Sequence, residues 1–77
     1  MNMKTTMVLE QSGLIIELFN KRTDFIYVTY QACTHGGWSK YLRGYENPQA
    51  HFESKSEIIA DANKLAKYYN AALEVLI

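Results

Sequence analysis

The sequence predicts an α+β domain in which one helix packs on one face of a mostly antiparallel sheet of four to five strands. Two observations favour this class. Three segments between residues 5 and 45 alternate apolar and polar side chains with the two-residue period of strands, and a fourth, residues 24–32, is rich in aromatic and β-branched residues. Residues 55–69 instead place apolar side chains on one stripe with a helical period, and a short apolar run follows them. The expected element order is therefore β-β-β-β-α-β.

The first three strands are expected at residues 5–11, 13–20 and 24–32. The third segment is the strongest of them, because it is rich in aromatic and β-branched residues. Only short turns separate the three segments, whereas parallel neighbours would need a crossover of a dozen or more residues. An antiparallel meander follows from these short links.

The fourth strand is expected at residues 38–45, after a turn in which Gly36 and Gly37 supply backbone freedom. Its alternation puts Trp38, Lys40 and Leu42 on one side and Ser39, Tyr41, Arg43 and Tyr45 on the other. After a turn that contains Pro48, residues 50–53 form a further strand of the sheet in one version of this topology.

The helix begins at a predicted capping box, in which Ser54 caps the first turn and Glu57 reaches back to the cap. Its apolar stripe consists of Ile58, Ile59, Ala62, Leu65, Ala66 and Tyr69. Asn70 suits the left-handed position that ends a helix, and residues 71–77 then form a terminal strand. The sequence leaves the place of this strand in the sheet open.

Length and composition limit what the chain can be. Its 77 residues allow one domain spanning residues 1–77, since a single core usually serves on the order of 100 residues. Eight basic and eight acidic residues give no net charge, which disfavours a dominant polyanion-binding role. The first 45 residues carry a net charge of +2 and the rest −2, an asymmetry too small to decide a function.

The chain is expected to be cytoplasmic and to have no membrane segment. Cys33 is the only cysteine, so no internal disulfide can form, and an unpaired thiol fits a reducing compartment. The first six residues have no apolar targeting region, and the longest apolar run is far shorter than a membrane span.

No enzyme, cofactor or metal site is predicted. Cys33, His35 and His51 are the only soft or borderline metal ligands, and their spacing fits none of the regular zinc patterns. Cys33 and His35 also lack an identifiable orienting acid or oxyanion donor for nucleophilic catalysis.

The aromatic content favours a contact surface, because six Tyr, three Phe and one Trp exceed what so small a core can hide. The predicted binding residues lie in the fourth strand and in the turn before it: Gly36, Gly37, Trp38, Lys40, Tyr41, Arg43 and Tyr45. Trp, Tyr and Arg dominate protein interfaces, so a protein partner is the leading hypothesis. RNA or single-stranded DNA binding on the same surface is the alternative. A third interpretation places Trp38 in the core and the tyrosines along the sheet edge.

Residues 24–32 are apolar on both predicted faces, since Phe25 and Tyr27 alternate with Ile26, Val28 and Tyr30. One face meets the helix and the other needs a cover. A homodimer that pairs these sheets back to back is the simplest candidate, although a bent sheet or a long loop would serve too.

The last third of the chain resembles the helix-strand end of many small bacterial and phage β-β-α-β domains. The residues that carry this likeness are Phe52, Ser54, Lys55, Glu57, Ala62, Leu65, Ala66, Leu73, Glu74 and Val75. In size and style the chain is also similar to the small inhibitors with which phages block host defence, including anti-CRISPR and anti-restriction proteins. This resemblance implies inhibition by surface contact and assigns no individual residue.

Overall fold

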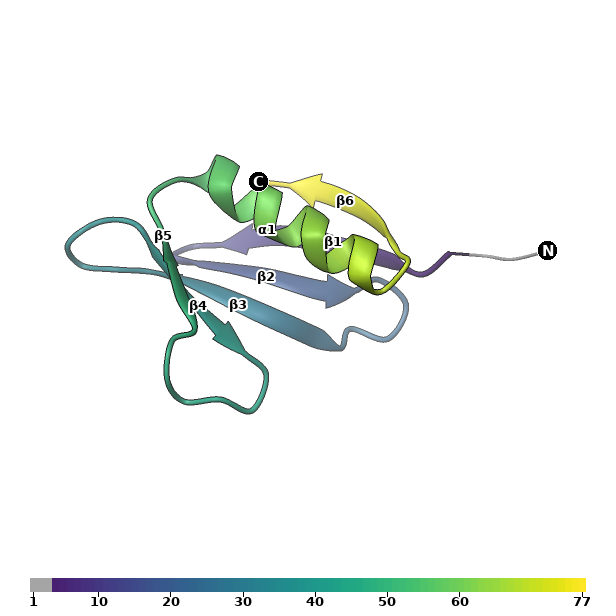
Figure 1. The fold of residues 1–77 in the computed structure, drawn as a ribbon, viewed down its shortest axis with the longest axis horizontal. Helices are drawn as coiled ribbons and strands as arrows, with labels where there is room; N and C mark the ends of the chain where they lie inside the picture. Colours follow the sequence, from purple (N-terminus) through teal and green to yellow (C-terminus); the bar gives the residue numbers. More distant parts are fainter. Residues whose placement is uncertain (1–3) are drawn as a thin grey trace.

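The computed structural model describes residues 4–77, and in it one helix lies across one face of a six-stranded sheet (Figure 1). The predicted α+β class, with a mostly antiparallel sheet and one covering helix, is confirmed. The expected number of four to five strands is too low by at least one, because a short strand before the helix also pairs with the sheet. Residues 1–3, which belong to the N-terminal stretch considered for a targeting signal, lie outside the described range.

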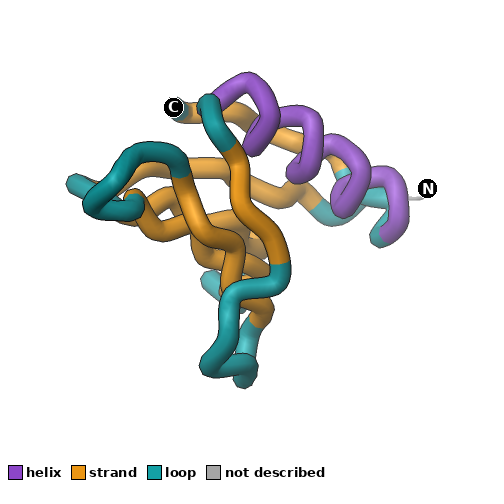
Figure 2. The backbone as a smooth tube through the Cα atoms, turned by 60° about the vertical axis from the view of Figure 1, so that its left-hand side comes forward, coloured by secondary structure: helices purple, strands orange, loops and turns teal. Residues whose placement is uncertain are grey.

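The first five strands form an antiparallel meander, and the last strand pairs with the free edge of the first strand. Figure 2 shows the helix on one side of this sheet. The order across the sheet is β5-β4-β3-β2-β1-β6, and only the β1–β6 pair is parallel. The elements are β1 (Thr6–Ser12), β2 (Ile15–Asn20), β3 (Ile26–Ala32), β4 (Trp38–Leu42), β5 (Ala50–Phe52), α1 (Lys55–Tyr68) and β6 (Ala72–Leu76).

The helix starts and ends where the sequence predicts. Ser54 accepts a hydrogen bond from the Glu57 backbone N–H, and the Glu57 carboxylate accepts one from the Ser54 N–H, which completes the capping box. At the other end Asn70 has a φ of 52°, and the Ala71 N–H donates to the Ala66 carbonyl at 2.8 Å. This left-handed residue turns the chain directly from α1 into β6.

The length of α1 sets the end of the sheet at which β6 begins. A helix of 14 residues rises about 20 Å, roughly the length of the sheet strands, so it returns the chain to the end of the sheet where β1 begins. β6 then runs parallel to β1, with Leu73 beside Met7 and Val75 beside Leu9. No described helix is long and apolar enough to cross a membrane.

The core lies between α1 and the sheet face that it covers. The strand alternation and the helical stripe both supply it, although Tyr69 at the end of the stripe is substantially exposed. The alternation predicted for residues 24–32 is wrong at the start of β3, because a register shift opposite Leu18 and Phe19 puts Tyr27 rather than Ile26 against the core. Leu14, which the alternation placed with Ile16, lies outside the strands and is exposed. The fully buried cluster is Met7, Leu9, Ile16, Leu18, Val28, Tyr30, Ile58, Ala62 and Ala66.

No helix within residues 4–77 covers the opposite sheet face. Val8 on this face is nevertheless only 3% exposed. Its cross-strand partner is Phe19, whose partner on the next strand is Ile26. Glu10 and Glu17 are direct cross-strand partners on this face. The back-to-back homodimer stays a prediction, and it would bring these carboxylates of both copies together.

Candidate binding surface

Strand β4 divides the predicted binding residues between the two faces of the sheet. Trp38 packs against the core, and Lys40 is the register partner of the buried Tyr30, so both lie on the face that α1 covers. Tyr41 is the register partner of Thr29 and lies on the opposite face. The alternation predicted for this strand is therefore correct, but it separates these residues.

Lys40 is held by the helix. Its Nζ lies 2.9 Å from the Asp61 carboxylate, and the Tyr30 hydroxyl donates to the same carboxylate oxygen at 2.8 Å. The side chains of Lys40 and Asp61 are only 14% and 17% exposed. Burial, together with the hydrogen bond to Asp61 and its charge, raises the pKa of Tyr30 well above its usual range. Lys40 thus joins β4 to α1 rather than offering its charge to a partner.

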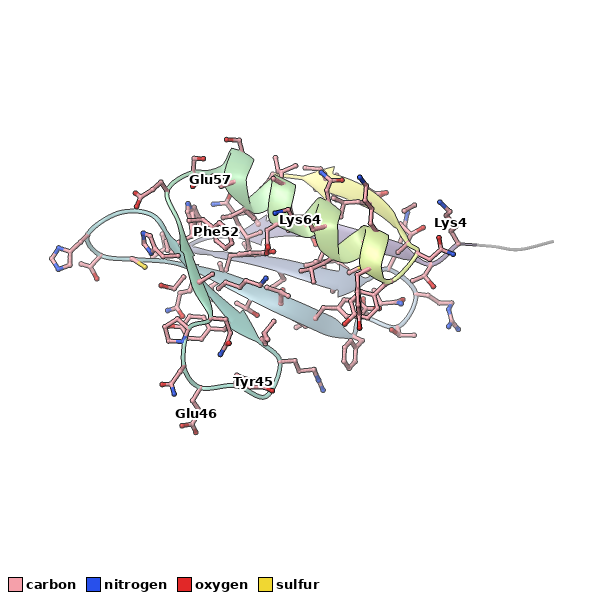
Figure 3. The ribbon with its side chains drawn as sticks, in the orientation of Figure 1. Lys4, Tyr45, Glu46, Phe52, Glu57 and Lys64 are labelled. Atoms are coloured by element: carbon pink, nitrogen blue, oxygen red, sulfur yellow. The ribbon has the colours of Figure 1, made fainter. Side chains whose placement is uncertain are left out.

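The remaining predicted residues lie at the two ends of β4. Gly36 and Gly37 belong to the loop before it, whereas Arg43 and Tyr45 follow its last residue and are exposed. Figure 3 shows Tyr45 in the loop that leads to β5, well away from α1. The structure therefore does not gather the seven predicted residues into one surface.

A different set of aromatic side chains does form a continuous surface, which we call the aromatic end. Its ring centroids are 5.1 Å apart for Phe25 and Tyr27, 5.0 Å for Tyr27 and Tyr69, and 5.0 Å for Tyr69 and Tyr68. The Arg43 guanidinium lies 4.5 Å from the centroid of the Phe25 ring. Phe25, Tyr69 and Tyr68 are 44%, 48% and 80% exposed. The sequence did not predict this surface, because its members come from the beginning of β3 and the residue before it, the C-terminal end of α1 and the residue after β4.

A basic cavity lies beside the aromatic end. It has a volume of about 430 Å³ and is lined by Lys4, Thr5, Thr6, Asn20, Lys21 and Arg22. Asn20 belongs to both regions, because its Nδ2 donates to the Tyr27 hydroxyl at 3.2 Å while its Oδ1 accepts from the backbone N–H of Arg22. The buried Asn20 side chain therefore fixes the cavity wall relative to the aromatic rings.

Folding concentrates positive charge at this end of the sheet. Besides Arg43 and the cations of the cavity, Lys67 lies in the last turn of α1. This end of the sheet therefore carries two carboxylates, Asp24 and Glu74, and five cations: Lys4, Lys21, Arg22, Arg43 and Lys67. A Glu74 carboxylate oxygen lies 3.3 Å from Lys21 Nζ. The three cations and six carboxylates of the rest of the chain leave it with a net negative charge. The neutral chain is polarised in space more strongly than its two sequence halves indicate.

A second group of polar side chains lies at the opposite end of the sheet. Cys33 Sγ is 3.1 Å from Ser39 Oγ and 4.0 Å from His51 Nδ1, and His51 Nε2 is 3.4 Å from a Glu53 carboxylate oxygen. His35, which the sequence placed beside Cys33, is exposed in the loop instead. We call Cys33, Ser39, His51 and Glu53 the thiol cluster. Among residues 4–77, no group of three or more His, Cys, Asp or Glu side chains is arranged to hold a metal ion.

The chain matches no protein-family model, no curated protein and no solved structure.

Proposed function

We propose that the protein is a non-enzymatic binding module whose aromatic end holds an acidic surface of a partner protein. The observation that carries this proposal is the continuous row of four rings and one guanidinium, three members of which are exposed aromatic side chains outside the buried core. Exposed contiguous apolar surface is typical of interaction sites. Tyr and Arg are also among the residues that dominate binding energy at protein interfaces.

The charge around the rings supports an acidic partner. Arg43 and Lys67 flank the aromatic end, and the cations of the basic cavity lie beside it. Complementary charge across an interface raises the association rate and disfavours partners of the same sign. A module of this kind acts by covering its partner's surface. Inhibition of a host defence protein, as by the small phage inhibitors that the chain resembles in size, is the finer form of the proposal.

Ring geometry favours a protein over a nucleic acid as the partner. Binding of single strands depends on free ring faces on which bases stack. Here the Phe25–Tyr27 and Tyr68–Tyr69 pairs meet edge to face at 68° and 89°, and Arg43 covers one face of Phe25. The basic cavity still favours RNA or single-stranded DNA as the second candidate, since Lys4, Lys21 and Arg22 could contact phosphates.

The proposal is tested by isolating the partner with the wild-type protein and measuring its affinity by calorimetry. We expect the Phe25→Ala/Tyr68→Ala variant to lose about 100-fold in affinity, because each anchoring ring contributes on the order of 1–2 kcal/mol. Tyr41→Ala removes the same kind of ring from the opposite sheet face and serves as the matched control. Equal losses in the two variants would reject the aromatic end as the binding surface.

A labelled single-stranded oligonucleotide tests the second candidate. Binding that falls steeply with salt and is lost in Lys21→Ala/Arg22→Ala would favour nucleic acid. A weak salt response, or retention of binding in that variant, would reject it.

A further inference from the structure

We propose that Cys33 is a site of thiol–disulfide exchange with low-molecular-weight disulfides, with His51 as the base and Glu53 as the carboxylate that orients it. This inference goes beyond the binding function and does not depend on it. The thiol cluster follows the end of β3 and spans β4 and β5 at their shared end, whereas the aromatic end lies at the other end of the sheet. Either proposal can therefore fail without the other.

The strands hold the cluster in place. Ser39 and His51 are direct cross-strand partners in β4 and β5, and Gln31, two residues before Cys33, is the partner of Ser39. Side chains two residues apart on a strand share a face, so Cys33, Ser39 and His51 project from the same side of the sheet. Their approach is set by sheet register rather than by a flexible loop alone.

Gly37 lies close to both Cys33 and His51. Its carbonyl accepts a hydrogen bond from the Cys33 backbone N–H at 3.0 Å, and its φ is +73°. A Cβ at this position would overlap the His51 ring and the Phe52 carbonyl. The glycine therefore lets the backbone approach the imidazole closely, and a side chain here would displace His51.

The contacts of His51 suit complementary roles for its two nitrogens, with the Gln31 carbonyl, 3.9 Å from Cys33 Sγ, as the other acceptor near the thiol proton. With its proton on Nε2, facing the Glu53 carboxylate at 3.4 Å, the ring leaves Nδ1 free to accept the proton of the Cys33 thiol. The carboxylate then stabilises the imidazolium, and the Ser39 hydroxyl, 3.1 Å from Sγ, can donate to the thiolate. A thiol, an imidazole and a carboxylate in series is the arrangement that activates nucleophilic cysteines.

The exchange step is balanced with the small disulfide as the only co-reactant. The thiolate of Cys33 attacks one sulfur of the disulfide RSSR, a new S–S bond to Cys33 forms, and the original S–S bond breaks. The leaving thiolate takes the proton from His51, so the products are the mixed disulfide and one RSH. Because Cys33 is the only cysteine of the chain, no internal thiol can resolve the mixed disulfide. The modification therefore persists until an external thiol removes it.

The test measures how fast Cys33 of the intact protein reacts with the aromatic disulfide DTNB at neutral pH. The urea-unfolded chain is the reference, and both rates are normalised to that of free glutathione in the same solvent. An unassisted thiol is only a few per cent thiolate at neutral pH, so we expect the folded protein to react on the order of tenfold faster. The half-burial of Cys33 alone would slow the reaction, so acceleration cannot come from access. Oxidised glutathione, followed by mass spectrometry, should add one glutathionyl group.

Three variants separate activation from mere accessibility. His51→Gln should lower the folded-state rate to that of the unfolded chain or below, and Glu53→Gln should give a smaller loss. His35→Gln changes the exposed histidine of the same loop and should leave the rate unchanged. The Glu53 side chain is 80% exposed, so its variant carries the test if His51→Gln does not fold. A wild-type rate no faster than that of the unfolded chain, or a rate unaffected by both His51→Gln and Glu53→Gln, would overturn the proposal.

Discussion

The inner side of β4 and the aromatic end contain the same kinds of side chain but use them differently. Lys40 pairs with the Asp61 carboxylate, which also accepts a hydrogen bond from the Tyr30 hydroxyl, and its side chain has little exposure to solvent. Arg43, three residues later, lies on the ring of Phe25 at the surface. A cation near an aromatic side chain therefore stabilises the fold where a carboxylate from another element binds it, as for Lys40. It remains accessible to a partner where no carboxylate binds it, as for Arg43. Composition alone could not distinguish the two cases.

The Asp61 network should be the most sensitive point of the fold. Asp61→Ala leaves the mostly buried Lys40 without its ion pair and removes the acceptor of the Tyr30 hydroxyl. Because removing one partner of a buried pair costs more than an exposed pair contributes, we expect the free energy of unfolding to fall by about 2–3 kcal/mol. Urea denaturation measures the loss.

Glu74→Ala is the matched control, since it breaks the exposed ion pair between Lys21 and Glu74. An exposed pair typically contributes about 0–1 kcal/mol. Losses of similar size in Asp61→Ala and Glu74→Ala would show that the network is no more than a surface ion pair.

Trp38→Ala should separate stability from binding. Trp38 packs against the core from β4, so its truncation should lower the free energy of unfolding by about 2 kcal/mol, less than for a fully buried ring. Partner affinity should not change, because Trp38 is not part of the aromatic end.

Tyr68→Ala should have the opposite effects, with an unchanged free energy of unfolding and a weaker affinity for the partner. Thermal denaturation of Trp38→Ala and Tyr68→Ala measures stability, and calorimetry measures partner affinity. If Trp38→Ala lost binding without losing stability, β4 would be part of the binding surface.

Alkaline pH should destabilise the protein through Tyr30. Below the ordinary tyrosine pKa of about 10 the hydroxyl is protonated in both states and adds no pH dependence. Above it the unfolded chain ionises first, because burial and Asp61 hold the pKa of Tyr30 higher in the folded state. The free energy of unfolding should then fall by up to about 1.4 kcal/mol per pH unit.

Tyr30→Phe provides the comparison for this pH dependence. It removes the ionisable hydroxyl but keeps the ring in the core, so its stability should fall less steeply above pH about 10 than that of the wild type. Urea titrations at several pH values on both proteins measure the difference in slope. Parallel slopes would show that Tyr30 ionises in the folded protein as readily as in the unfolded chain.

The features that the sequence predicted correctly depend on neighbouring residues. Ser54 and Glu57 cap the helix across three residues, and Asn70 ends it through the backbone bond of the next residue. The alternation of β4 likewise separates Trp38 and Lys40 from Tyr41. These patterns follow from helical and strand geometry, which repeat over two to four residues.

The features that the sequence did not predict depend on contacts between distant segments. Phe25 and Tyr68 meet through Tyr27 and Tyr69 only after α1 has crossed the sheet. His51, rather than the nearby His35, approaches Cys33 because β5 pairs with β4. No spacing in the chain relates these residues, so neither surface could be assembled from periodicity.

The sequence by itself determined the class of the fold, the ends of the helix and the core-facing side of β1, β2 and β4, because hydrophobic periodicity and capping are local. In β3 a register shift opposite Leu18 and Phe19 brings Tyr27, rather than Ile26, against the core. Only the tertiary structure decided that β6 joins β1, that Asp61 engages Lys40, and which rings and cations share a surface. The physical reason is that a strand or helix specifies which of its faces is apolar, whereas the partner of that face is chosen by packing the whole chain.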